Sequence, residues 1–341
     1  MATVIKTSRL FSDTLLTHYR QQGDPVADAV ITAVVDSGGR EAVGTLMRWL
    51  GDGTNLDAAT QPAIVQQFFN DYSQLPPWAD QARMARGIAF FGQNQGTIGL
   101  VLGAYSLPYT YLGADGAQLL WLTERIKNDT ARRLQETGEW FFNIMNAKAW
   151  KSGRAVTYTL KIRLIHAAAR WFGLHTGRWN MDWGYPVNQE DMAITNLSFS
   201  YVVVRGLRQS GISTTEADEE DYLHLINVIV YLNGLAEALL PQNLREAYQL
   251  STRIERRQFR SSEVGIGLTK ALLDAISQHA GQSGPVDADT ARSFIAGEMR
   301  FFLGDRWANM LGIPPAAVGK RLAGLVNRLP IFPDTPFGMV K

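Results

Sequence analysis

Residues 154–172 have the sequence RAVTYTLKIRLIHAAARWF, which is apolar on nearly every face of a helix. At 100° per residue, four polar side chains fall within about 60° of one another on one narrow stripe. They are Thr159, Arg163, His166 and Arg170. Because a helix that is apolar nearly all round is normally buried, we expect this one inside the molecule, with a histidine between two arginines.

This polar stripe has two interpretations. In the first, His166 is a core residue with a hydrogen-bond partner, and the two arginines reach solvent or pair with carboxylates. In the second, His166 ligates a metal, and Arg163 or Arg170, one turn away on either side, meets an anionic group of the same cofactor. Haem b fits the second, because a ring nitrogen can bind iron while guanidinium groups pair with the propionates. The spacing of the residues alone does not decide between these two interpretations.

The composition excludes several classes of function. The chain has 341 residues, of which 46% are apolar and 19% charged, as expected for a globular protein with a sizeable core. A net charge of +1 provides no long-range attraction to nucleic acid, so we expect no nucleic-acid partner. There is no cysteine, which excludes disulfides, thiolate-ligated haem and cysteine-held iron–sulfur clusters.

Neither the N-terminal segment nor the most apolar run of the sequence indicates a secreted or membrane-spanning protein. The first 20 residues lack the apolar core of a secretory signal and contain no twin arginine, so we expect a cytoplasmic protein. The most apolar run, residues 98–113, is shorter than the roughly 20 residues of a membrane-spanning helix and contains Pro108. We interpret it as core or pocket wall.

Helical spacing recurs along the whole sequence, which predicts a single all-α domain over residues 1–341. Helices are expected near residues 25–36 and 39–50, separated by Gly38-Gly39. Another is expected to end at Gly92. A further helix should begin after Asn188, a good N-cap, and continue through Leu207.

Two more helices place polar residues on apolar faces. In residues 130–146, a face with Arg133, Thr137 and Trp140 has Glu136 beside it. The simplest explanation of this face is an ordinary amphipathic boundary. The predicted helix 221–240 carries His224 on a polar stripe, which makes His224 the rival metal ligand.

Four segments, in this order and spacing, resemble the family of haem-dependent oxygenases that includes latex clearing protein, the bacterial rubber oxygenase, and the fungal oxygenase of mycophenolic acid biosynthesis. They are ARRLQETGEWF (131–141), LKIRLIHAAAR (160–170), the block from Trp183 to Asp191 with the following TNLSFS, and YLHLINVIVYLNGLAEALLP (222–241). The resemblance implies an all-α helical bundle with a globin-like core, about residues 75–260, around one b-type haem. It matches His166 to the proximal iron ligand.

The resemblance also assigns roles around that histidine. Arg133 and Thr137 match the arginine and threonine that line the haem pocket, and Arg163 and Arg170 are further candidates for contacts with the propionates. Where rubber oxygenases have a lysine just before the threonine, this chain has Glu136. A carboxylate cannot replace an amine as a neutral iron ligand, which argues against rubber as the substrate. Glu136 becomes a candidate general base for removal of an allylic proton.

The sequence therefore predicts a cytoplasmic haem b oxygenase that uses dioxygen on a small, apolar, unsaturated substrate such as an isoprenoid. Glu136, Arg133 and Thr137 are the predicted catalytic residues. One alternative keeps the haem but makes the protein a sensor, a carrier or a peroxidase-like enzyme. Another is a cofactor-free helical protein in which the polar stripes form buried ion pairs.

Overall fold

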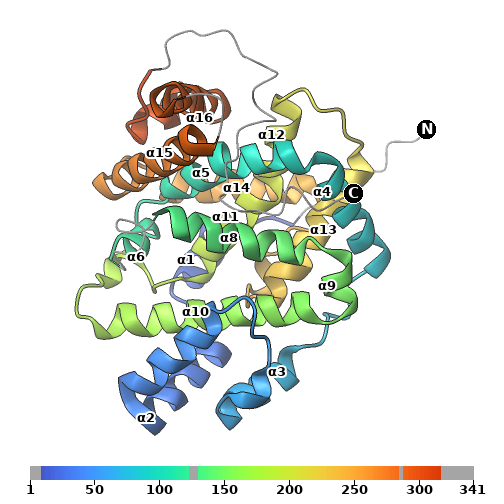
Figure 1. The fold of residues 1–341 in the computed structure, drawn as a ribbon, viewed down its shortest axis with the longest axis vertical. Helices are drawn as coiled ribbons and strands as arrows, with labels where there is room; N and C mark the ends of the chain where they lie inside the picture. Colours follow the sequence, from blue (N-terminus) through green and yellow to red (C-terminus); the bar gives the residue numbers. More distant parts are fainter. Residues whose placement is uncertain (1–8, 123–129, 284–286, 316–341) are drawn as a thin grey trace.

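The fold comes from a computed structural model that describes residues 9–122, 130–283 and 287–315. Within these residues the secondary structure is helical, and the β-type pairing is limited to an isolated bridge between Gly113 and Phe259. The predicted all-α class is confirmed. Figure 1 shows α10 running across the lower part of the view, with α2 and α3 on one side of it and α8 and α13 on the other, while α15 and α16 lie at the opposite end of the molecule.

The N-terminal half contains most of the short elements. They are α1 (Asp13–Arg20), α2 (Pro25–Gly51), the 3₁₀ turn η1 (Ala58–Thr60), α3 (Ala63–Tyr72), α4 (Gln81–Val101), the π-helical turn η2 (Leu102–Ser106), α5 (Leu107–Tyr111), α6 (Ala117–Leu122), α8 (Thr130–Ile144) and α9 (Ala147–Lys151). The C-terminal half comprises α10 (Arg154–His175), η3 (Met181–Trp183), α11 (Gln189–Phe199), α12 (Tyr201–Gln209), α13 (Glu216–Leu232), η4 (Glu237–Leu239), α14 (Leu244–Gln258), α15 (Glu263–Ser283) and α16 (Ala288–Met310).

Helix α10 is the segment from which the sequence analysis starts, and it is buried as predicted. It packs against α2 and α3 on one side and against α8, α9 and α13 on others (Figure 1). Leu160, Leu164 and Ala168 are completely buried. Because neighbours on several sides hold this helix, its polar stripe has a fixed position in the interior.

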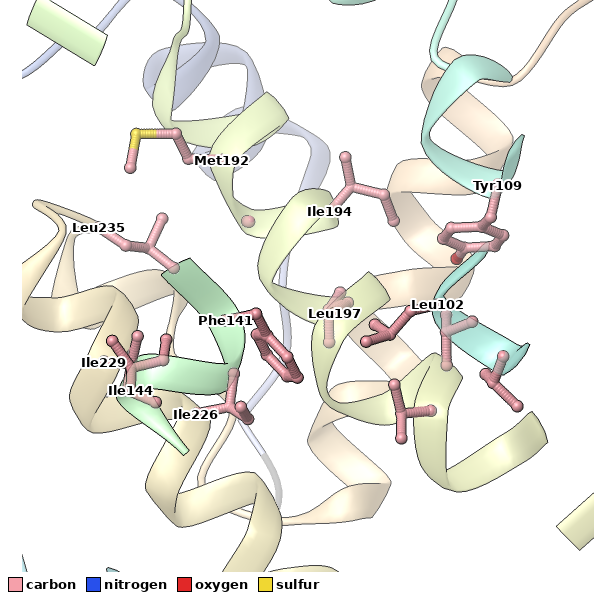
Figure 2. Packing of buried hydrophobic residues seen from close by; sticks show 14 of the residues in the cluster. Leu102, Tyr109, Phe141, Ile144, Met192, Ile194, Leu197, Ile226, Ile229 and Leu235 are labelled. Atoms are coloured by element: carbon pink, nitrogen blue, oxygen red, sulfur yellow. The ribbon is translucent and has the colours of Figure 1, made fainter. Parts of the chain in front are cut away.

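Apolar side chains of α8, α11 and α13 meet in one part of the core. Figure 2 shows Phe141 and Ile144 of α8 facing Leu197 of α11 and Ile226 of α13. The ring of Phe141 also lies 5.2 Å from the ring of Phe199, at the end of α11. These buried contacts hold α8, and therefore its polar face, against the interior of the molecule.

One of the helix breaks predicted from the sequence is present in the structure, and two other predicted helix boundaries differ from it. Helix α2 is kinked at Gly38 and Gly39, where Gly39 has a φ of +64° that favours glycine. The expected end at Gly92 is wrong, since α4 continues to Val101. The expected single helix after Asn188 is also wrong, because Ser200 leaves the helical conformation and its hydroxyl donates to the Asn196 carbonyl at 2.9 Å.

Close approach of α4 and α13 depends on Gly87. A Cβ atom there would lie 2.8 Å from the backbone oxygen of Asp221 and 2.9 Å from Cβ of Leu225.

In the described part of the chain, no helix is both long enough and apolar enough to cross a membrane.

Candidate functional site

His166 lies in the middle of α10, and neither of its ring nitrogens hydrogen-bonds to a described residue. Nδ1 is buried without a partner. Burial, followed by the positive charges of Arg170 and Arg133, lowers the pKa of His166 to about 4, while Asp24 acts in the opposite direction. At neutral pH the imidazole is therefore uncharged, with one nitrogen lone pair available to a ligand.

The surroundings of His166 combine strong desolvation with partial access. Its Nδ1 is buried, whereas the residue as a whole is half-buried, and burial is the main cause of its low pKa. The imidazole is therefore shielded from bulk water although the residue is not completely enclosed.

The two arginines of the stripe both pair with carboxylates of the α2 region. Arg163 makes a two-point contact with Asp24, at 2.6 Å from Nε and 3.1 Å from Nη2, and also packs over the rings of Phe68 and Tyr72. This agrees with the first interpretation of the stripe. His166, however, lacks the hydrogen-bond partner that this interpretation requires.

Arg170 keeps part of its hydrogen-bonding capacity. Its Nε lies 2.6 Å from Oδ1 of Asp28, and Nη1 donates to the Val187 carbonyl at 3.3 Å. Its Nη2 is buried and has no partner in the described residues. Arg170 thus offers an unused donor one turn from His166, whereas the guanidinium of Arg163 is held by Asp24.

The polar face of α8 reaches the same region. Arg133 lies close enough to His166 for its charge to lower the histidine pKa. Its Nη1 contacts Oε2 of Glu136 at 3.0 Å, and Arg132 contacts the other carboxylate oxygen at 3.2 Å. Thr137 is half-buried, and Nε1 of Trp140 is buried without a partner. Helix α8 packs against α10, and Arg133 is the residue of this polar face whose charge acts on His166.

Tyr111, at the end of α5, belongs to this region and was not predicted from the sequence. The residue is 5% exposed, and its hydroxyl has no hydrogen bond to a described residue. Burial raises the pKa of Tyr111, and the charge of Arg133 opposes the shift, which indicates that the two side chains are near each other. The available signal was its place in the apolar run 98–113, interpreted as core or pocket wall.

His224, the rival ligand, has a structural partner. Its Nε2 accepts a hydrogen bond from the backbone N–H of Asp80 at 2.9 Å, and only 8% of the residue is exposed. Asp80 is the N-cap of α4, so this contact supports the start of that helix. Of these two histidines, His166 is the one with an imidazole free to bind a ligand.

Comparison with known proteins identifies the group to which this arrangement belongs. Residues 97–329 match the family described as ER-bound oxygenase mpaB/B'/Rubber oxygenase, catalytic domain. The chain belongs to this oxygenase family. Rubber oxygenase of Streptomyces sp. (strain K30) is 26% identical over 305 residues, which cover 88% of this chain and 72% of that protein.

The structure of latex clearing protein in the closed state shares the fold. It superimposes with a TM-score of 0.72 at 23% identity, covering 93% of this chain and 87% of that chain. The resemblance carried by the four sequence segments is thereby confirmed. So is the prediction that the chain is an enzyme of the oxygenase type.

Proposed function

We propose that this protein is a haem b-dependent oxygenase that uses dioxygen on an apolar, unsaturated substrate such as an isoprenoid. The observation that carries the proposal is His166, a desolvated imidazole with no hydrogen bond at either nitrogen to a described residue. Buried polar atoms are rarely left without a partner unless a ligand completes the site. Membership in the oxygenase family supports the reaction class.

The residues around His166 fit haem b. A neutral imidazole is the form that binds iron, and the low pKa of His166 means that no proton has to be removed at pH 7. The free Nη2 donor of Arg170 and the guanidinium of Arg133 suit the two propionates. We assign His166 as the iron ligand, and Arg170, Arg133 and Thr137 as residues that contact the haem.

When bound, haem would supply the activation of dioxygen, while the protein positions the substrate and controls protons. The buried apolar side chains that meet between α8 and α11 would keep water away from an apolar substrate bound near them. Arg132 and Arg133 each form an ion pair with the carboxylate of Glu136 and hold it in place on α8, and we assign Glu136 as the general base. Glu136 would then accept a proton from an allylic carbon of the substrate.

Dioxygen consumption by the haem-loaded protein tests this function. We expect uptake with myrcene, an unsaturated isoprenoid hydrocarbon, and none with 2,6-dimethyloctane, its saturated analogue. His166→Leu should abolish the uptake, whereas the matched variant His224→Leu should retain it. Haem binding without alkene-dependent uptake would contradict the oxygenase proposal and favour a sensor or carrier.

A further inference from the structure

The side-chain amide of Gln189 joins segments that are far apart in the chain. Gln189 is the first residue of α11 and is only 4% exposed. Its Nε2 donates to the carbonyl of Gly23 at 2.8 Å and to the carbonyl of Gly234 at 3.0 Å. Its Oε1 accepts from the backbone N–H of Ala236 at 2.8 Å. Because Gly23 precedes α2 while Gly234 and Ala236 follow α13, this buried amide holds both segments against the start of α11.

Gly234 lies directly against the ion pair between Arg163 and Asp24. A Cβ atom at Gly234 would overlap Oδ2 of Asp24 and would lie 2.8 Å from Nε of Arg163. The φ of Gly234 is +91°, a conformation that also favours glycine. Both charged side chains of the pair are nearly buried, with 11% and 6% exposed. A displacement of this turn would therefore displace the ion pair with it.

Gly23 has the same relation to the second ion pair of α10. A Cβ atom at Gly23 would lie 2.9 Å from Oδ2 of Asp28 and 3.0 Å from Cδ of Arg170. The two ion pairs are also linked to each other, because the backbone N–H of Asp24 donates to Oδ2 of Asp28 at 3.3 Å. The two carbonyls that Gln189 binds thus belong to the two glycines that contact these ion pairs.

We propose that Gln189 is a positioning residue of the candidate site, because its amide sets where the two guanidinium groups that flank His166 lie. These groups belong to Arg163 and Arg170, three residues before and four residues after the histidine on α10. Gln189 acts on them through the two glycines. Without the amide, two buried carbonyls and one N–H would lose their partners, and the segments that support the ion pairs would separate.

The consequence for haem rests on the proposed function. In that proposal the free Nη2 of Arg170 contacts a propionate, and its Nε is held by Asp28 at 2.6 Å. A hydrogen bond needs a donor at a defined distance and angle, so a loosened ion pair would weaken the contact with the propionate. Gln189 would therefore affect haem affinity although it binds backbone groups of the protein.

Gln189→Met tests the proposal first in the haem-free protein, because methionine has a similar length and makes none of the three hydrogen bonds. NMR with ¹⁵N labelling measures hydrogen exchange at the Nε–H groups of Arg163 and Arg170, each 2.6 Å from its carboxylate. We expect exchange at both groups to accelerate by about tenfold or more, since the ion pairs open more readily. Haem titration should show an affinity lower by roughly three- to tenfold, as for one hydrogen bond.

The matched control is Gln66→Met. The amide of Gln66 also bridges two backbone carbonyls, those of Ala59 at 3.1 Å and Gln61 at 2.8 Å, next to η1. This variant should keep both exchange rates and the haem affinity within about twofold of the wild type. Gln189→Glu is the second test variant, because it keeps the side-chain volume and the acceptor for Ala236 but presents an oxygen to the two glycine carbonyls. It should reproduce the effects of Gln189→Met.

Arginine exchange rates that remain at the wild-type values in both Gln189 variants would overturn the proposal. So would accelerated exchange with an unchanged haem affinity, because Gln189 would then have a structural role only. A wild-type protein that binds no haem, with accelerated exchange in the variants, would overturn the proposed oxygenase function and leave the positioning of the two guanidinium groups by Gln189 supported.

Discussion

Replacement of His166 by leucine separates a ligand-binding histidine from a structural one. In the haem-free protein, Nδ1 of His166 is buried and has no partner among the described residues. A buried, unsatisfied polar atom costs about 1–3 kcal/mol. Leucine has a similar volume and no polar atom. We therefore expect His166→Leu to leave the free energy of unfolding unchanged or to raise it by up to about 2 kcal/mol.

The matched change at His224 should have the opposite sign. His224→Leu removes the acceptor of the Asp80 N–H, which lies 2.9 Å away in a largely buried setting. That donor then has no partner at the start of α4, at an expected cost of about 1–3 kcal/mol. The two substitutions are chemically identical, so the difference between them reports the environment of each imidazole.

Urea denaturation of the haem-free proteins measures both changes in the free energy of unfolding. Titration with haem measures whether each variant still binds haem, and in what stoichiometry. His166→Leu should bind no haem in a defined stoichiometry, while His224→Leu should bind it like the wild type as long as it is folded. If His166→Leu instead destabilised the haem-free protein by more than about 2 kcal/mol, the imidazole would have a structural partner. The reasoning from its free nitrogens would then be refuted.

Other substitutions address the remaining assignments. Arg170→Met leaves the carboxylate of Asp28, whose side chain is 24% exposed, without its cation. We expect it to lower the free energy of unfolding, measured by urea denaturation, by about 2–4 kcal/mol. A loss below about 1 kcal/mol would contradict this expectation. Burial lowers the pKa of Lys161 to about 8 from 10.5, so the unfolded chain binds more protons between these values and the protein gains up to about 3 kcal/mol as the pH rises through this window. Lys161→Met should lack that gain in denaturation at a series of pH values, and an identical pH dependence in both proteins would show that Lys161 does not titrate there. Glu136→Gln should leave haem content unchanged and lower turnover by roughly 10²- to 10⁴-fold, so undiminished turnover would exclude a general base at this position.

Local signals in the sequence predict the fold well where a short-range contact decides the structure. Asn188 caps α11 by accepting from the N–H of Asp191, three residues away, as its position predicts. The kink at Gly38 and Gly39 likewise follows from glycine itself. Gly92, in contrast, stays inside α4, because packing against α12 and α13 offsets the helix propensity of one glycine.

The sequence predicts the candidate site only in part, because some of its contacts join residues that are far apart in the chain. The 3.6-residue period of α10 predicts a buried polar stripe, and the stripe is there. The partners of its arginines, Asp24 and Asp28, lie about 140 positions earlier in the chain, so only the fold brings them together. Tyr111 was missed because a tyrosine in an apolar run has no periodic pattern to indicate that its hydroxyl lacks a partner.

The absorption spectrum of the purified protein, expressed with added haem precursor, tests the central claim most directly. We predict an intense Soret band and one equivalent of b-type pyridine haemochrome, with both lost in His166→Leu and retained in His224→Leu. A colourless, folded wild-type protein that takes up no added haem would contradict the assignment of His166 as an iron ligand.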